Sequence, residues 1–246
     1  MRAALSLTAI LLLGACNMSA DAREDKGDHQ NVRRDFQVGA FQKVGLAGPH
    51  DVVVTVGGAP SVRAEGDKAE IDRLDIRVEN GELKIGTKRD EGWSWHFGGG
   101  RHRHDRVTIY VTAPSLAAAA IAGSGDMKID KVTGSGFNAS IAGSGDMHLA
   151  SLNVGEAHFS LAGSGDISAA GKAGKATISV AGHGDIVASG LEIADATISV
   201  MGSGDVTARA TQTADVSVMG SGDVTLSGPA KCSIHKMGSG DVHCGG

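Results

Sequence analysis

The feature that most constrains this 246-residue chain is a four-residue glycine turn that returns seven times between Ile121 and Asp241. The first copy spans Gly123–Asp126, and every later copy keeps the order Gly-Ser-Gly-Asp except the fourth, in which His183 replaces the serine. The spacing from one turn aspartate to the next is 18 to 20 residues. A fixed period of this length indicates stacked repeats, because one unit is too small to bury its own apolar face.

Within each repeat the apolar residues alternate with polar ones, which is typical of strands rather than helices. Met127 and Ile129 follow the first turn, and Phe137, Ala139 and Ile141 precede the second. We therefore expect two short strands in each coil, with one face directed inward. The opposite face carries a serine in five successive repeats, which stacking would align as an external column: Ser140, Ser160, Ser179, Ser199 and Ser217.

Stacked coils of this kind predict an all-β fold, a parallel β-helix or β-solenoid. Each strand would lie about 4.8 Å from its equivalent in the next coil. The turn glycines fit because we expect them to need positive φ and because a Cβ there would meet the neighbouring coil. Small inward residues imply a narrow interior without room for a ligand, so function is expected on the outer surface, and no cofactor is predicted.

Stacking the turns also places their aspartates in one column: Asp126, Asp146, Asp166, Asp185, Asp205, Asp223 and Asp241. Neighbouring carboxylates about 4.8 Å apart repel by roughly 0.9 kcal/mol in water, whereas a hydrogen bond to a charged carboxylate contributes about 1.5 to 3 kcal/mol. We therefore interpret each aspartate as a cap on its own turn. The alternative is a column that binds divalent cations, although the nonapeptide calcium pattern is not met.

The first residues indicate export and lipid attachment. Residues 1–15 have a short apolar run that is too short to span a membrane and are interpreted as a lipoprotein signal peptide. Cleavage would leave Cys16 as the acylated N-terminus, with an ordinary secretory signal as the alternative. Asn17 is not the aspartate that retains lipoproteins at the inner membrane, so the outer membrane is the expected location. Residues 16–35 are polar and are expected to form a flexible tether.

Composition limits the partners that the chain could bind. The formal net charge is −5 and no basic patch is evident, which argues against nucleic acid. Aromatic residues make up only 3% of the chain, which leaves few candidates for stacking against sugars.

The residues before the repeats, 36–115, have strand patterns without a strict period. Asn80-Gly81 lies between two apolar alternations and predicts a hairpin. Gly48–Asp51 looks like a degenerate copy of the glycine turn. We therefore expect degenerate coils and an N-terminal cap here, followed by the solenoid in residues 116–246, because an uncapped end would expose the core.

The order of these features resembles a known family. Phe41, Val44, the Gly48–Asp51 turn, the Asn80-Gly81 hairpin and the strand Val107–Val111, followed by repeated Ala-Gly-Ser-Gly-Asp, are similar to the "putative auto-transporter adhesin, head GIN domain" family. The resemblance covers residue 36 to the C-terminus. It implies a right-handed parallel β-helix in a secreted bacterial protein, often a lipoprotein, and it supplies no catalytic residues.

One insertion before the repeats concentrates unusual side chains. We considered a weak metal site, a contact surface for a protein or glycan, and a hairpin tip that covers the solenoid, with the last favoured. The candidate metal ligands are His96, His102 and His104, and the candidate contact aromatics are Trp93, Trp95 and Phe97.

Two cysteines remain near the C-terminus, apart from Cys16. By register Cys232 replaces an inward alanine and Cys244 an inward leucine of the preceding coil. Because the expected compartment is oxidising, a disulfide is favoured, with two reduced core cysteines as the alternative.

Three functions follow from these observations. The favoured one is a non-catalytic, lipid-anchored protein of the cell envelope that presents a rigid solenoid surface to an envelope protein or a glycan. The second is a cation-binding module that uses the aspartate column. The third is a polysaccharide-active enzyme, which is disfavoured because short corner turns leave no irregular loops to form a catalytic cleft.

Overall fold

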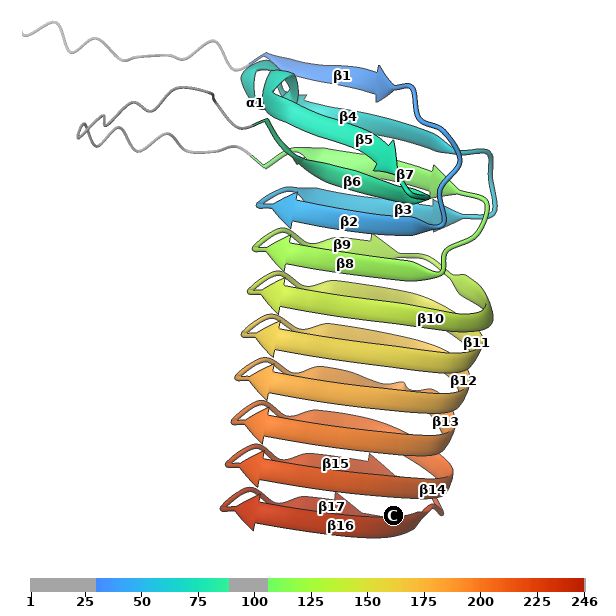
Figure 1. The fold of residues 1–246 in the computed structure, drawn as a ribbon, viewed down its shortest axis with the longest axis vertical. Helices are drawn as coiled ribbons and strands as arrows, with labels where there is room; N and C mark the ends of the chain where they lie inside the picture. The colour runs from blue at the N-terminus through green and yellow to red at the C-terminus, as the bar shows by residue number, and fades with distance from the viewer. Residues whose placement is uncertain (1–29, 89–105, 246) are drawn as a thin grey trace, which may run out of the picture.

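The structure, a computed structural model, describes residues 30–88 and 106–245 and consists of stacked β-coils closed at one end by a cap (Figure 1). One sheet, called here the front sheet, contains the strands that run toward the glycine turns. The back sheet contains the strands that leave those turns. To a viewer who looks along the stack from the cap end, the chain turns clockwise as it moves away. The coil is therefore right-handed (Figure 1). The predicted β-solenoid is therefore confirmed.

The repeat coils are formed by ten strands in sequence order. They are β8 (Ala118–Gly123), β9 (Met127–Ile129), β10 (Val132–Gly143), β11 (Met147–Gly163), β12 (Ile167–Gly182), β13 (Ile186–Gly202), β14 (Val206–Gly220), β15 (Val224–Ser227), β16 (Lys231–Gly238) and β17 (Val242–Cys244).

Equivalent residues of successive coils pair in parallel and in register. Ile141 pairs with Ile121 on one side and with Leu161 on the other, and turn glycines pair with turn glycines. Each of these three apolar residues is at most 2% exposed. The inward residues of successive coils therefore stack in rows, and each residue is covered by its partner in the next coil.

The expectation of two short strands per coil is wrong in one respect. β11 is continuous over 17 residues, because the chain stays extended and paired around the corner opposite the glycine turns. There Val132 pairs with Leu152, and both are buried. This corner forms a third, short side of the coil, and its buried residues complete the core.

The coil next to the cap is threaded out of sequence order. β2 (Lys43–Gly48) and β3 (Asp51–Val56) lie between the later strands β6 (Glu82–Thr87) and β7 (Thr108–Ala113) on one side and β8 and β9 on the other. Gly48 pairs with Gly123, so the degenerate turn occupies the same column as the repeated turns.

The cap consists of β1 (Asn31–Phe36), β4 (Ser61–Asp67), α1 (Lys68–Arg73) and β5 (Leu74–Glu79). β1 and β4 extend the back sheet in antiparallel order, and β5 extends the front sheet by a hairpin with β6. The hairpin turn is the predicted one, with positive φ at Asn80 and Gly81. Ile71 of α1 is fully buried and closes the core between the two sheets.

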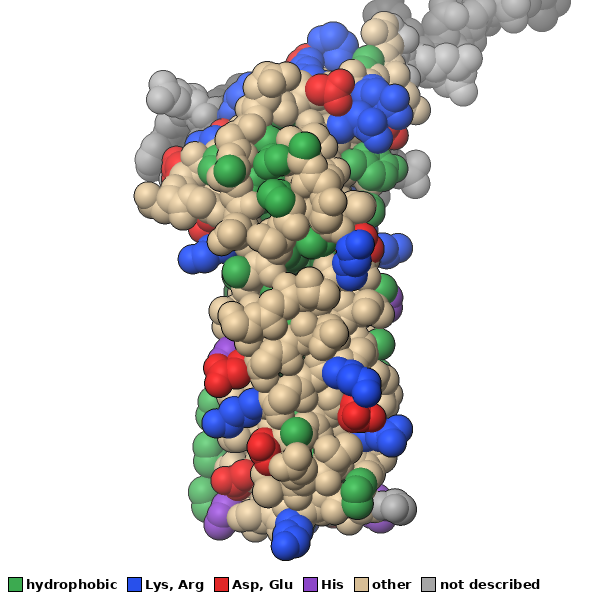
Figure 2. All heavy atoms as spheres, turned by 90° about the vertical axis from the view of Figure 1, so that its right-hand side faces the viewer, with side chains coloured by type: hydrophobic (Ala, Val, Ile, Leu, Met, Phe, Trp, Pro, Cys, Tyr) green, Lys and Arg blue, Asp and Glu red, His purple; other side chains and the backbone are tan. Residues whose placement is uncertain are grey.

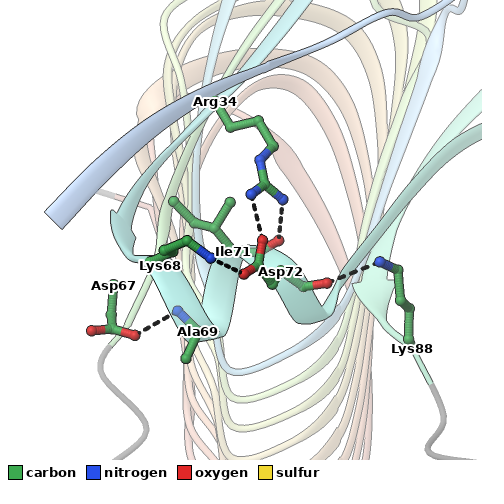
Figure 3. A network of polar contacts seen from close by, with 7 residues as sticks. All are labelled: Arg34, Asp67, Lys68, Ala69, Ile71, Asp72 and Lys88. Carbon is green, nitrogen blue, oxygen red and sulfur yellow. Dashed lines mark hydrogen bonds and ion pairs between the residues drawn. The ribbon is translucent and has the colours of Figure 1, made fainter. Parts of the chain in front are cut away.

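Helix α1 has only six residues and could not persist alone in water. Figure 3 shows how polar contacts hold it in place. The Asp67 carboxylate accepts a hydrogen bond from the Ala69 N–H at 2.8 Å, which caps the N-terminus. The Asp72 carboxylate accepts hydrogen bonds from the guanidinium of Arg34 and the ammonium of Lys68. The Asp72 backbone oxygen accepts a hydrogen bond from the Lys88 ammonium. The helix is thus tied to β1 and to the end of β6.

The opposite end of the stack is closed differently. A disulfide joins Cys232 of β16 to Cys244 of β17. Ile234 occupies the register position of buried Val216 but is 45% exposed, because no coil of the described residues covers it on the far side. Lys236 stands where the preceding coil has buried Val218 and pairs with Asp241. A charged residue at an inward position discourages further strand addition at this open edge.

Candidate functional site

The glycine turns form one edge of the solenoid, where the backbone of successive coils approaches most closely. At the first glycine of a middle turn, Gly163, φ is 137° and a Cβ would lie 2.1 Å from the Gly143 carbonyl oxygen. At the second glycine, Gly165, a Cβ would lie 2.0 Å from the Gly145 oxygen, but φ is not positive. The expectation that both glycines need positive φ is therefore wrong, since the second is required only by the close approach.

The turn aspartates form a ladder between coils. The N–H of Asp166 donates to the Asp146 carboxylate at 2.9 Å, and the N–H of Asp185 donates to the Asp166 carboxylate at 2.9 Å. The same bond recurs from Asp126 to Asp241 at 2.7 to 3.1 Å. Each carboxylate from Asp126 to Asp223 thus caps the turn of the next coil, and the prediction that it caps its own turn is wrong.

Two residues that are not among the predicted site residues extend this ladder toward the cap. The Asp51 carboxylate accepts from the Asp126 N–H at 3.4 Å, which makes Asp51 the first member of the column. Arg106 lies 3.4 Å from the Asp51 carboxylate and 3.3 Å from that of Asp126. The likeness of Gly48–Asp51 to the repeated turn was the signal for Asp51, while Arg106 lies outside any repeat.

The ladder gives no support to the cation-binding alternative. One oxygen of every carboxylate from Asp126 to Asp223 accepts a backbone N–H, and Arg106 and Lys236 neutralise the two ends. Among the described residues, no three His, Cys, Asp or Glu side chains are grouped so that they could hold a metal ion.

The outer face of the front sheet is the most regular surface of the molecule. Its serine column follows the predicted register from Ser140 to Ser217 and ends at His235. Beside it, next to the turns, runs a second column of exposed residues. That column contains Ala47, Ala122, Ala142, Ala162, Ala181, Met201, Met219 and Met237. The face is therefore flat in the coils near the cap, where the column consists of alanines. In the last three coils the longer methionine side chains project from it.

A groove of about 1090 Å³ lies where the β5–β6 hairpin meets this flat face. Its floor is formed by small residues of β2, β8, β10 and β11, including Ala122, Ala142 and Ser160. Its wall is formed by the hairpin residues Asp75, Arg77, Glu82 and Lys84. Of the described residues that line the groove, none is aromatic.

Ion pairs hold the charged wall in shape. Arg77 and Lys84 both contact the Glu79 carboxylate at 2.7 Å, and Arg77 also pairs with Asp75. The hydrogen bonds from Lys84 and then Arg77 lower the pKa of Glu79, and Glu79 and then Asp75 raise the pKa of Arg77. The wall therefore presents side chains of both charge signs to the groove.

The corner opposite the glycine turns has a different character. Figure 2 shows basic and acidic side chains spread over it among other residues, without a large area of one sign on the stack. An example is Lys172, which pairs with Glu192 of the next coil at 3.5 Å. This view gives no support to a nucleic-acid surface, which would need clustered basic residues.

Several predicted site residues lie outside the described residues. They are the lipidation residue Cys16, the candidate metal ligands His96, His102 and His104, and the aromatics Trp93, Trp95 and Phe97. In the described ranges, no helix has the length and hydropathy needed to cross a membrane.

Comparison with known proteins gives a consistent result. The sequence profile described as "Putative auto-transporter adhesin, head GIN domain" matches residues 40–230. No curated protein sequence matches the chain.

Among solved structures, a putative adhesin from Bacteroides fragilis is similar with a TM-score of 0.76 and 22% identity, over 87% of this chain and 97% of that one. A putative lipid binding protein from Parabacteroides distasonis has a TM-score of 0.68 and 24% identity, over 89% and 98%. A putative adhesin from the same organism has a TM-score of 0.69 and 21% identity, over 89% and 98%. At these identities the likeness shows the fold.

Proposed function

Since the chain belongs to the family described as "Putative auto-transporter adhesin, head GIN domain", we propose that it is a non-catalytic adhesion module, lipid-anchored at the outer membrane, whose front sheet binds a partner in the cell envelope. The observation that carries this proposal is the groove between the β5–β6 hairpin and the flat face of the front sheet. An adhesion role fits the family name, which describes binding rather than catalysis.

The groove suits an extended polypeptide segment. Its floor of alanine and serine lets a flat chain approach the sheet closely, and the paired charges of Arg77, Lys84, Asp75 and Glu82 offer donors and acceptors at one side. Binding sites for glycans usually stack sugars on aromatic rings, and the described lining has none. We therefore favour a protein partner, with a glycan as the alternative.

Lipid attachment at Cys16 would keep the cap near the membrane. Thirteen residues separate Cys16 from Gln30, where the described part begins, and a chain of that length reaches at most about 45 Å. The cap would thus stay within about 45 Å of the membrane. Labelling with radioactive palmitate tests the anchor, and equal labelling of wild type and Cys16→Ser would contradict it.

Site-specific photo-crosslinking in intact envelopes tests the binding face. A photoreactive residue at Ala122 or Ala142, which are exposed on the groove floor, should crosslink to a discrete protein. The matched control is the same residue at His148, which is exposed on the back sheet. Crosslinks that form equally from both faces, or from the back sheet alone, would contradict the proposal, and loss of crosslinking after glycosidase treatment would favour the glycan.

A further inference from the structure

The second column of the front sheet changes character in the last three coils. Met201 pairs with Met219, and Met219 pairs with Met237, so three methionines lie in register on consecutive coils. Their exposed fractions are 45%, 43% and 69%, although methionine is usually buried. The same position is alanine in the coils from β8 to β12. The fold itself therefore does not require methionine there.

The spacing of this column allows the three thioethers to meet. Register partners in adjacent parallel strands lie about 4.8 Å apart, and each methionine side chain has three rotatable bonds beyond the backbone. The side chains extend from the same face of one sheet, so their sulfur atoms can converge on a point above Met219. The two other methionines of the described residues, Met127 and Met147, are buried in the core.

Two histidines border the methionine column, and both replace serines of otherwise regular columns. His235 ends the serine column and lies two residues before Met237 on the same face of β16. His183 replaces the turn serine one coil before Met201, just after Gly182, whose partner Gly202 follows Met201. Both histidines are exposed. The column thus has an exposed histidine near each end, His183 in the coil before Met201 and His235 in the coil of Met237.

Thioether and imidazole donors favour particular metal ions. Thioether sulfur is a soft ligand that selects Cu(I), whereas carboxylates and carbonyls suit calcium and magnesium. Lys236, which precedes Met237 in sequence, pairs with Asp241 at 3.4 Å. We propose that the outer face of the last three coils binds one soft monovalent metal ion, Cu(I), through Met201, Met219 and Met237, with His235 or His183 as a further ligand.

Titration with Cu(I) tests the proposal on the full chain in anaerobic buffer, with a chromophoric chelator as competitor. The chain carries Cys16→Ser, which removes the one cysteine outside the disulfide, and a thiol assay verifies that Cys232 and Cys244 stay oxidised. We expect one Cu(I) per chain. Each single change to leucine at Met201, Met219 or Met237 should weaken binding by roughly tenfold or more, because a direct ligand contributes at least as much as its supporting contacts, and the triple variant should not bind.

The matched control is Met147→Leu, which removes a buried thioether of the same chain and should leave the affinity unchanged. Silver ion, a soft ion without redox chemistry, should shift the methyl resonances of Met201, Met219 and Met237 but not those of Met127 and Met147. Binding that is equal in wild type and triple variant, or no binding at all, would overturn the proposal. In the latter case the column would be an apolar contact surface only.

Discussion

The cap and the stack of coils are stabilised by different means. In the stack the same contacts repeat from coil to coil: turn glycine packs on turn glycine, and each aspartate carboxylate from Asp126 to Asp223 accepts the N–H of the next coil. In the cap the contacts are individual: Ile71 seals the core, and Arg34 and Lys68 pair with Asp72. The stack should therefore be most sensitive to an added Cβ at its turn glycines. The cap should be most sensitive to the loss of particular side chains.

The largest effect is expected in the turns of the stack. Gly163→Ala combines backbone strain of about 1–3 kcal/mol with overlap onto the Gly143 oxygen that costs about 1–3 kcal/mol more. Gly48→Ala is the matched control, since φ there is 131° but nothing lies within 4 Å of the added Cβ. Denaturant unfolding should show a clearly larger loss for Gly163→Ala. Equal losses would show that close approach between coils does not limit the stack.

In the cap the largest effect is expected at Ile71. Ile71→Ala should lower the free energy of unfolding by about 2–5 kcal/mol, because it opens a cavity beneath α1. Ile234→Ala at the opposite end should change it by less than about 1 kcal/mol, because that side chain is already 45% exposed. A comparable loss from both changes would mean that the far end is as tightly sealed as the cap.

The disulfide should make a moderate contribution to the free energy of unfolding, and its effect should be confined to the last coil. Replacing Cys232 and Cys244 by serine removes a link that closes a 12-residue separation and contributes about 2–3 kcal/mol. Because the linked strands form the last coil, hydrogen exchange should accelerate in β16 and β17 while β10 to β12 stay protected. Faster exchange throughout the stack would show that its coils unfold as one unit from this end.

The smallest effect is expected from the cap ion pairs in acid. Hydrogen bonds from Lys68 and then Arg34 lower the pKa of Asp72 from 3.8 to about 2. The folded-state pKa is below the unfolded value, so this contribution is present above about pH 4 and is lost as the pH falls toward 2. The difference in melting temperature between wild type and Asp72→Asn should therefore shrink between pH 4 and pH 2.

Asp166→Asn is the counterpart of this change in the stack. Asparagine keeps an oxygen that can accept the Asp185 N–H, so the free energy of unfolding at neutral pH should change by less than about 1 kcal/mol. A drop of several kcal/mol would show that the charge of the ladder, rather than its hydrogen bonds, stabilises the coils.

Local repetition made the stack predictable, and its absence limited the prediction elsewhere. The glycine turns and the alternation around Ile141 specify coils, register and the aspartate column, because each coil repeats the same short-range pattern. Whether the Asp166 carboxylate caps its own turn or the next depends on a distance of a few ångströms, which spacing cannot resolve. The corner residue Leu152 lies in neither of the two alternating runs of its coil, so the pattern does not predict that it is buried.

The groove depends on long-range pairing. Arg77 and Lys84 reach the flat face only because the hairpin pairs with β2 rather than with its neighbours in sequence. Nothing in the sequence near Ala142 indicates that a charged wall lies above it. The inward positions of Cys232 and Cys244, in contrast, could be predicted from their register against the preceding coil, while the sequence left a disulfide and two reduced cysteines as alternatives.

The out-of-order threading of the first coil has a consequence for how the molecule forms and how its length can vary. β2 and β3 gain both of their neighbours only when residues 82–87 and 108–129 are present, so the part of the chain from β2 to β9 has to fold as one cooperative nucleus with contacts far apart in sequence. Below β9 each new coil needs only the coil before it as a template. Copies of the repeat can therefore be gained or lost below the nucleus, and each one changes the reach of the protein by about 4.8 Å.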